Sequence, residues 1–263
     1  MTRIDKRFEL LRKEGRKAFI PYITAGDPNL ETTRDLVFAL EKAGADIIEL
    51  GVPFSDPIAD GPVIQRGTER ALRNRVGLTK VLKLAAEIRT QSQIPLLLFS
   101  YYNPLFNHRL SRLAEDCVKS GIDGILATDL TVEESDEFVQ VVRGAGLNTV
   151  FLVAPTSSAE RMKKIALSST GFLYAVSRTG VTGERQQLDT ELHGFLHTLR
   201  GFTTAPIAVG FGISRPEHVR AVWQQADGAV VGSAIVREIE QHIGQPDLVE
   251  RVAAFSRWLS HPE

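Results

Sequence analysis

The sequence predicts an α/β fold, a single (β/α)8 (TIM) barrel, and three observations lead to that prediction. The chain of 263 residues contains eight short apolar runs that alternate with amphipathic stretches. Most of these runs are continuously apolar, as expected for parallel strands buried on both faces. Eight such units leave about 33 residues for each, which is roughly what a βαβ crossover needs.

Each expected strand is short, and the helices between strands carry apolar residues on one face. The eight strands are expected at residues 18–24, 47–52, 96–101, 124–128, 149–153, 172–176, 207–210 and 229–231. Apolar positions at helical spacing predict helices over 30–42, 110–119, 216–225 and 248–259. The third of these helices has Ser214 as its expected N-cap. Ile4, Phe8 and Leu11 mark an extra amphipathic helix before the first strand.

The spacing of the strands is uneven, and it directs attention to two loops. About 49 residues separate strands two and three, about 34 separate strands six and seven, and about 25 separate most others. In a barrel the active site lies in the βα loops at the carboxyl ends of the strands. The expanded loops after strands two and six are therefore the first places to look. No Pro-, Gly- or Ser-rich linker divides the chain, so we expect one domain over residues 1–263.

A doubly wound open sheet is the alternative fold. Such a sheet would usually have fewer strands and a Gly-rich turn after the first of them. Here that turn reads A-G-D-P-N, which lacks the glycine fingerprint.

Composition narrows the class of partner. Lys and Arg number 31 and Asp and Glu number 32, giving a formal charge of −1. A nucleic acid or an anionic membrane would favour a basic excess. The single cysteine, Cys117, permits no internal disulfide and no Cys-based metal site. The charged N-terminal stretch lacks the apolar core of a signal peptide, so we expect a cytoplasmic protein.

Glu49 lies inside the apolar run of the second strand, in I-I-E-L-G-V-P-F-S-D-P-I-A-D-G-P. A carboxylate held there should have a raised pKa, because burial disfavours the charged form. Such a carboxyl group can act as a general acid and base near neutral pH. The alternative is a structural carboxylate paired with a basic residue inside the barrel.

Asp60 lies eleven residues further on, in the expanded loop. Asp-Gly-Pro is a turn signal, so a purely structural role is an open alternative, and Asp56 could likewise begin a turn. However, two carboxylates in different surroundings, one on a rigid strand and one on a loop, can take separate acid and base roles.

Glycines at the ends of strands seven and eight suggest a phosphate site. Strand seven ends in G-F-G-I-S, with Gly212, and strand eight ends in V-V-G-S-A-I, with Gly232 and Ser233. Barrels often bind phosphate at these two loops and at the N-terminus of a short helix. Each glycine alone could equally be a turn. The loop after strand six, S-R-T-G-V-T-G-E-R, could be a lid over substrate or an ordinary exposed loop.

Several kinds of chemistry lack their residues. No lysine lies at an expected strand end in the barrel mouth, so a Schiff-base mechanism has no nucleophile. The six histidines lie in helical or terminal stretches. His193 and His197 stand four apart on an outer helix, and we interpret them as part of a solvated face. We expect no metal site and no nucleophilic triad.

The chain resembles the tryptophan synthase alpha subunit family along essentially its whole length. The resemblance rests on P-Y-I-T-A-G-D-P, E-L-G-V-P-F-S-D-P-I-A-D-G-P-V-I-Q, S-R-T-G-V-T-G, G-F-G-I-S and G-S-A-I-V, in that order. It implies a (β/α)8 barrel that cleaves indole-3-glycerol phosphate to indole and glyceraldehyde 3-phosphate in tryptophan biosynthesis. It implies that Glu49 is the acid and base, and that Asp60 holds the indole N–H.

The resemblance also assigns binding residues. It implies that the phosphate is bound by Gly183, Gly212, Gly232 and Ser233. It implies an indole pocket and lid made of Tyr22, Phe99, Tyr101, Leu126, Tyr174, Thr182 and Phe211, with Thr182 contacting Asp60 when the loop closes. No cofactor is implied in this chain.

The resemblance further implies a partner. A beta subunit carrying pyridoxal phosphate would receive the indole through a tunnel, in an α2β2 heterotetramer. The residues that would face it are Asp56, Pro57, Asn103 and Phe106. One departure lies nearby, because residues 129–134 read D-L-T-V-E-E where the family often has D-L-P-P-E-E. Another is Tyr22, where phenylalanine is also common.

Three other functions stay open. A free-standing indole-releasing lyase would work without a beta subunit. A non-catalytic allosteric barrel would have no need of Glu49, Asp60 or the phosphate glycines. Another phosphate-binding barrel, such as an isomerase of histidine or tryptophan synthesis, would share the glycines but not the E-L-G-V-P-F-S-D-P-I-A-D segment.

Overall fold

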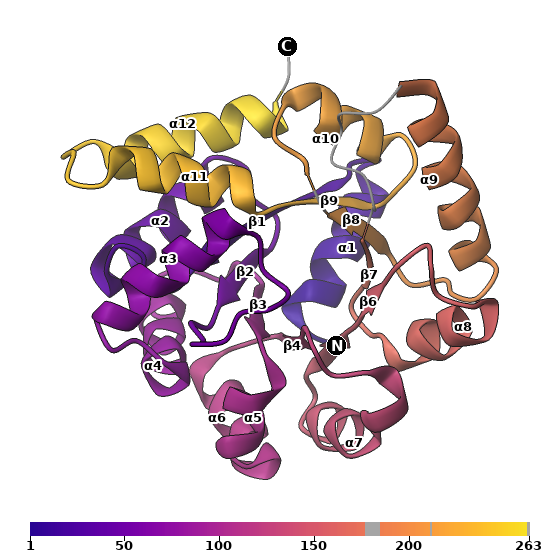
Figure 1. Cartoon of the computed structure of the whole chain (residues 1–263), viewed down its shortest axis with the longest axis horizontal. Coiled ribbons are helices and arrows are strands. Elements are labelled where there is room, and N and C mark those ends of the chain that lie inside the picture. Colours follow the sequence, from indigo (N-terminus) through magenta and orange to yellow (C-terminus); the bar gives the residue numbers. More distant parts are fainter. Residues whose placement is uncertain (177–184, 211, 262–263) are drawn as a thin grey trace.

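The computed structural model describes residues 1–176, 185–210 and 212–261, which form parallel strands surrounded by helices (Figure 1). The described strands are β1 (Ala18–Thr24), β2 (Ile48–Gly51), β3 (Leu96–Ser100), β4 (Gly124–Ala127), β5 (Asn148–Val150), β6 (Leu152–Val153), β7 (Leu173–Val176), β8 (Ile207–Gly210) and β9 (Gly228–Val231). They form one sheet in the order β5-β4-β3-β2-β1-β9-β8-β7-β6.

The predicted fifth strand nearly closes this sheet into a barrel. It is divided at Phe151 into β5 and β6, which stand at the two ends of the sheet order. β5 pairs in parallel with β4, and β6 pairs in parallel with β7. The two edges of the sheet are therefore joined through one continuous stretch of backbone. This confirms the predicted barrel and its eight strand positions.

Except for the first helix, which lies across one end of the barrel, the described helices lie around its outside (Figure 1). They are α1 (Arg3–Lys13), α2 (Leu30–Lys42), α3 (Pro62–Arg73), α4 (Leu78–Arg89), α5 (Tyr102–Asn107), α6 (Leu110–Ser120), α7 (Asp136–Gly144), α8 (Ala159–Ser168), α9 (Arg185–Arg200), α10 (Pro216–Trp223), α11 (Ser233–His242) and α12 (Leu248–Ser260). A short 3-10 turn, η1, spans Val132–Glu134. None of the described helices is both long and apolar enough to cross a membrane.

The predicted helices match α1, α2, α6 and α12 closely, and one predicted detail of α10 is wrong. The N-cap of α10 is Arg215, which makes no side-chain cap bond, and the helix ends at Trp223. Pro216 provides the first helical position, where a missing N–H costs nothing. The Ser214 N–H instead donates to Nδ1 of His218 at 3.3 Å.

The expansion after β2 consists of a loop, at residues 52–61, followed by the two helices α3 and α4. The other predicted expansion follows β7 and falls on residues 177–184, which lie outside the described residues.

Helix α1 closes the end of the barrel where the strands begin. Its buried face presents Ile4, Phe8 and Leu11 to the barrel interior, and the Phe8 and Phe172 rings lie 5.7 Å apart. Arg3 of α1 forms an ion pair of 3.0 Å with Asp123, just before β4. With this end filled by apolar side chains, a substrate can reach the barrel interior only from the carboxyl ends of the strands.

Candidate active site

Glu49 projects into the barrel from the middle of β2. Its neighbours Ile48 and Leu50 pack outward against the helices, so strand alternation turns Glu49 inward. It stands beside Tyr22 of β1 and Leu97 of β3. The residue is 1% exposed, and its Oε1 has no hydrogen-bond partner among the described residues. Burial raises the pKa of the Glu49 carboxyl to about 8, so the group holds its proton at neutral pH.

Asp60 lies on the loop between β2 and α3, and Tyr101 at the end of β3 supports that loop. The Tyr101 hydroxyl accepts a hydrogen bond from the Ala59 N–H at 2.8 Å. Gln65 of α3 donates to the Asp60 carbonyl oxygen at 2.9 Å. Partial burial raises the pKa of the Asp60 carboxyl to about 6, against the opposing effect of a hydrogen bond with Tyr101. Between about pH 6 and pH 8, Asp60 is therefore mostly ionised while Glu49 is mostly protonated.

Tyr22 lies near both carboxyl groups. Burial is the main reason that the pKa of its hydroxyl is raised, and the charges of Asp60 and Glu49 both add to that rise. Its ring packs edge-on against Phe99, with centroids 5.1 Å apart. Glu49 and Asp60 thus border the same aromatic pocket, although one comes from a strand and the other from a loop.

The predicted pocket residues line the barrel interior at different depths. Leu126 is fully buried, whereas Phe99 and Tyr174 are half-buried and contact the interior cluster that contains Leu126. A Cβ atom at Gly51 would collide with the Tyr22 hydroxyl, and one at Gly210 would collide with the Tyr174 hydroxyl. These two glycines therefore leave room for the tyrosines on the neighbouring strands.

The described part of the predicted phosphate site lies at the ends of β8 and β9. Gly232 is the N-cap of α11, and Ser233 is the first residue of that helix, which begins without a side-chain cap. The first N–H groups of α11 are thus available to an anion. A Cβ atom at Gly232 would be 3.7 Å from Cβ of Tyr22, which places this helix end beside the pocket. Gly212 has a φ of +72°, a conformation that favours glycine.

Three predicted residues, Gly183, Thr182 and Phe211, lie outside the described residues. Within the described ranges, no group of three or more His, Cys, Asp or Glu side chains is placed to hold a metal ion.

The family model for the tryptophan synthase alpha chain matches residues 8–260. The chain belongs to the tryptophan synthase alpha chain family. A tryptophan synthase alpha chain from Solibacter usitatus is 52% identical over 259 residues, which are 98% of this chain and 97% of that protein. The crystal structure of tryptophan synthase subunit alpha from Legionella pneumophila is 38% identical, with a TM-score of 0.92, and the match covers 99% of this chain and 97% of that one.

A further similar structure belongs to the tryptophan synthase α2β2 complex of Pyrococcus furiosus. It is 39% identical with a TM-score of 0.85, and the match covers 92% of this chain and 97% of that one. This member of the tryptophan synthase alpha chain family therefore resembles these relatives in sequence and in fold along nearly all of its length.

The residues predicted to face a beta subunit lie on two neighbouring segments at the barrel mouth. Asp56 and Pro57 belong to the loop that carries Asp60, and Asn103 and Phe106 belong to α5. The Tyr101 hydroxyl accepts a hydrogen bond from the Ala59 N–H of the loop, and Tyr101 directly precedes α5. Asp56, Asn103 and Phe106 are exposed, and Pro57 is partly so. Two residues depart from the family pattern in the segment 129–134. Val132 is buried, and the Thr131 hydroxyl donates a hydrogen bond to the Glu134 carboxylate at 3.4 Å.

Sequence reasoning missed three residues at this alpha chain's mouth. Leu152 is half-buried beside Tyr174 in the interior cluster. Ile64 of α3 packs against Tyr22. Ile58, next to Pro57, is an apolar side chain that is 87% exposed. The I-A-D-G-P stretch offers a signal for Ile58, because an apolar isoleucine in an otherwise polar turn can indicate a contact with a partner.

Proposed function

We propose that this chain cleaves indole-3-glycerol phosphate to indole and glyceraldehyde 3-phosphate, with Glu49 acting as acid and then as base. The observation that carries the assignment of Glu49 is its buried carboxyl, which has an unpartnered oxygen and a pKa of about 8 at the inner end of an aromatic pocket. A group that holds its proton at neutral pH can donate it to a substrate carbon, which is the first requirement of this cleavage.

The proposed reaction balances with Glu49 alone as the proton carrier. Protonated Glu49 gives its proton to C3 of the indole ring and becomes a carboxylate. That carboxylate takes the proton of the glycerol hydroxyl on the carbon next to the ring. The C–O bond becomes a carbonyl, the carbon–carbon bond to C3 breaks, and its electron pair restores the indole ring. Glu49 ends protonated, ready for the next substrate.

Asp60 has the complementary role in this proposal. Protonation at C3 places a positive charge on the indole nitrogen, and an ionised carboxylate that accepts the indole N–H would stabilise it. The lower pKa of Asp60, about 6, suits that role. Because the protonated ring accepts the electrons, the step needs neither a lysine imine nor a metal. We accordingly propose that this chain works without a cofactor of its own.

The phosphate would be held mainly by backbone N–H groups. Gly232 and Ser233 offer the uncapped N-terminus of α11 beside Tyr22, and Gly212 follows the neighbouring strand β8. We include Gly183 in this site, with Thr182 and Phe211 at the lid and the pocket, on the family resemblance alone. Backbone donors explain how a chain of net charge −1 can bind a phosphorylated substrate.

We further propose that the chain assembles with a beta subunit carrying pyridoxal phosphate, which would consume the indole. The exposed apolar side chains Ile58 and Phe106 support a contact there, at 87% and 58% exposure. The loop of Ile58 also carries Asp60, so a partner bound on this surface could influence the catalytic loop directly. Asp56, Pro57 and Asn103 would complete the contact.

The direct test follows indole release from indole-3-glycerol phosphate, with and without a beta subunit. We expect Glu49→Gln to lower kcat by about 10³-fold and Asp60→Asn by about 10²-fold. Glu87→Gln, which changes an exposed carboxylate on α4, is the matched control and should leave kcat unchanged. Added beta subunit should accelerate the unchanged chain. Full activity in Glu49→Gln would refute the assignment of the proton carrier, and no acceleration would refute the partner.

A further inference from the structure

A second cavity lies at the opposite end of the barrel, against α1. It has a volume of about 330 Å³ and is lined by Phe8, Leu11, Arg12, Gly15, Arg16, Lys17, Arg200, Thr204, Pro206 and Asp227. These residues come from α1, from the turn between α1 and β1, from the end of α9, and from the segments that precede β8 and β9. Since α1 fills the barrel interior between this cavity and the mouth, the cavity is separate from the proposed active site.

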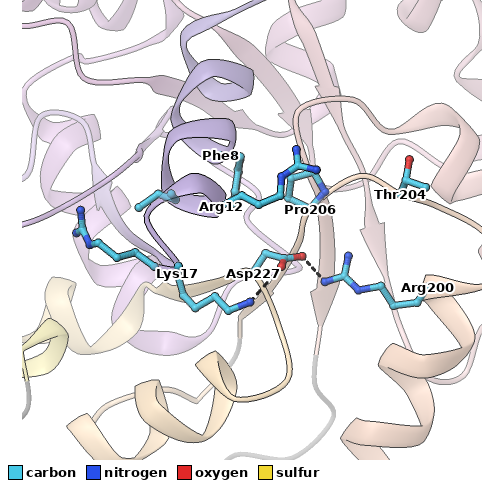
Figure 2. A pocket seen from close by; sticks show the side chains of 10 residues that line it. Phe8, Arg12, Lys17, Arg200, Thr204, Pro206 and Asp227 are labelled. Atoms are coloured by element: carbon cyan, nitrogen blue, oxygen red, sulfur yellow. Dashed lines mark hydrogen bonds and ion pairs between the residues drawn. The ribbon is translucent and has the colours of Figure 1, made fainter.

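The described lining of this cavity is strongly cationic. It contains four basic side chains, Arg12, Arg16, Lys17 and Arg200, and one carboxylate, Asp227. Figure 2 shows Lys17 and Arg200 approaching Asp227 from opposite sides. Asp227 accepts a hydrogen bond from the Ile207 N–H at 2.9 Å. It also forms ion pairs with Lys17, at 3.3 Å, and with Arg200. One carboxylate thus neutralises part of the charge of two cations.

Arg12 and Arg16 add positive charge that Asp227 does not balance. Figure 2 shows the Arg12 guanidinium beside Pro206, turned away from Asp227. Among the described residues, no carboxylate lies within ion-pair distance of Arg12. Arg16 pairs with exposed Glu14 at 3.1 Å and lies 3.9 Å from buried Asp46. Arg12 therefore brings to this concave site a positive charge that no described carboxylate neutralises at ion-pair distance.

The floor of the cavity is apolar. Phe8 and Leu11 form it with small exposed fractions, 5% and 1%, and Pro206 adds a ring on one side. The volume is at the lower end of the range for small-molecule sites. A ligand that fits would be small, with a compact carbon part against this floor and a compact anion against the guanidinium groups. Guanidinium groups match phosphate oxygens especially well.

We propose that this cavity binds a small organic phosphate, with Arg12 and Lys17 as its main anion contacts. The site is distant from the catalytic carboxylates, so the ligand would be neither substrate nor product held at the mouth. A ligand there would contact α1, the β1 entry and the β8 entry together. It would stabilise the end of the barrel that α1 closes.

The test uses the full chain and phenyl phosphate as the probe. Lysines are acetylated at increasing phenyl phosphate concentration and at physiological ionic strength, and each site is quantified by mass spectrometry. We expect protection of Lys17 at millimolar probe, while Lys13 stays unprotected. Lys13 is a useful internal reference because it is an exposed lysine in the last turn of α1 that does not line the cavity. Inorganic phosphate should protect Lys17 more weakly, because it lacks the carbon part.

Two variants make the test specific. Arg12→Gln should raise the probe concentration that half-protects Lys17 by about tenfold. Lys13→Gln removes the same charge one residue away and should change that concentration by less than about twofold. Equal effects of the two variants would reduce the binding to general charge attraction and overturn the proposal. Absence of Lys17 protection would overturn it as well, and equal protection by inorganic phosphate would overturn the organic ligand.

Discussion

Glu49 and Asp60 are both acidic side chains, yet the structure gives them different surroundings. Glu49 is enclosed by the strand neighbours Tyr22 and Leu97, and burial alone raises the pKa of its carboxyl to about 8. Asp60 is half-buried on a loop, and a hydrogen bond with Tyr101 limits the rise in its pKa to about 6. Between these two pH values one group is protonated and the other is ionised, as acid and electrostatic partner should be.

This difference predicts a bell-shaped dependence of kcat/KM on pH. Activity should rise through about pH 6, as Asp60 loses its proton and can accept the indole N–H. It should fall through about pH 8, as Glu49 loses the proton that it must donate. Stopped assays of indole release across this range would measure both limbs.

The substrate phosphate also titrates near pH 6, so a variant must assign the acidic limb. The residual activity of Asp60→Asn should still fall through about pH 8, but it should no longer rise through about pH 6. An Asp60→Asn profile with an unchanged acidic limb would assign that limb to the phosphate instead.

At the scale of the element, the strands could be predicted from the sequence, and part of the helical layer could not. A parallel strand covered on both faces must be apolar throughout, so runs such as Leu96–Ser100 stand out. Helix α3 buries mainly small residues, Gly67, Thr68 and Ala71, with one larger apolar side chain, Val63. A Cβ atom at Gly67 would be 2.8 Å from Oδ2 of Asp27 and 3.2 Å from Cγ1 of Val236. A glycine at such a contact carries no hydrophobic signal, so the sequence does not show which neighbours α3 packs against.

The same contrast applies to the candidate site. Glu49 was visible because a carboxylate interrupts an apolar strand. Asp60 and the phosphate glycines were ambiguous, because aspartate and glycine are also the residues of ordinary turns. Ile64 and Leu152 approach the pocket from elements far apart in the chain, so local pattern could not place them there.

Arg70 of α3 joins three elements behind the barrel mouth. It donates to both carboxylate oxygens of Asp27, at 2.7 and 2.9 Å, and to Glu240 of α11 at 2.7 Å. The Asp27 side chain is fully buried. Burial raises the pKa of this carboxyl, and Arg70 opposes that rise. The pair therefore keeps the loop after β1 in contact with α3 and α11, the helices that follow Asp60 and Gly232.

Removing Arg70 should be costly, because Asp27 would be left buried without its guanidinium. We expect Arg70→Gln to lower the free energy of unfolding by about 3 kcal/mol, as measured in urea. Arg66→Gln breaks an ion pair of 2.7 Å between an exposed arginine and the same Glu240, and it should cost much less, because water screens the exposed pair. Asp27→Asn combined with Arg70→Gln should recover part of the loss. A loss in Arg70→Gln no larger than in Arg66→Gln would show that the buried pair contributes little.

At the scale of the whole molecule, the barrel is filled at one end and reactive at the other. The apolar face of α1 supports the interior cluster on which Phe99 and Tyr174 rest. That dry interior raises the pKa of Glu49, and the same burial must act on the stability of the fold. Function and stability are therefore linked through one carboxyl group.

The sign of that link follows from proton binding. The pKa of Glu49 is about 8 in the folded chain, against an ordinary value of 4.5. Between these values the folded chain holds a proton that the unfolded chain has lost, so the Glu49 contribution to stability falls as pH rises. The fall approaches about 1.4 kcal/mol for each pH unit in which only the unfolded form is ionised, and it ends above the folded pKa.

Glu49→Gln removes this dependence, because glutamine stays neutral. The stability of Glu49→Gln relative to the unchanged chain should therefore increase from pH 5 to about pH 8 and then level off. Urea unfolding at a series of pH values measures that difference. Glu87→Gln, an exposed change on α4, should give a nearly flat difference over the same range. A flat difference for Glu49→Gln would mean that its carboxyl is solvated in the folded chain, and the alkaline limb of activity would then need another group.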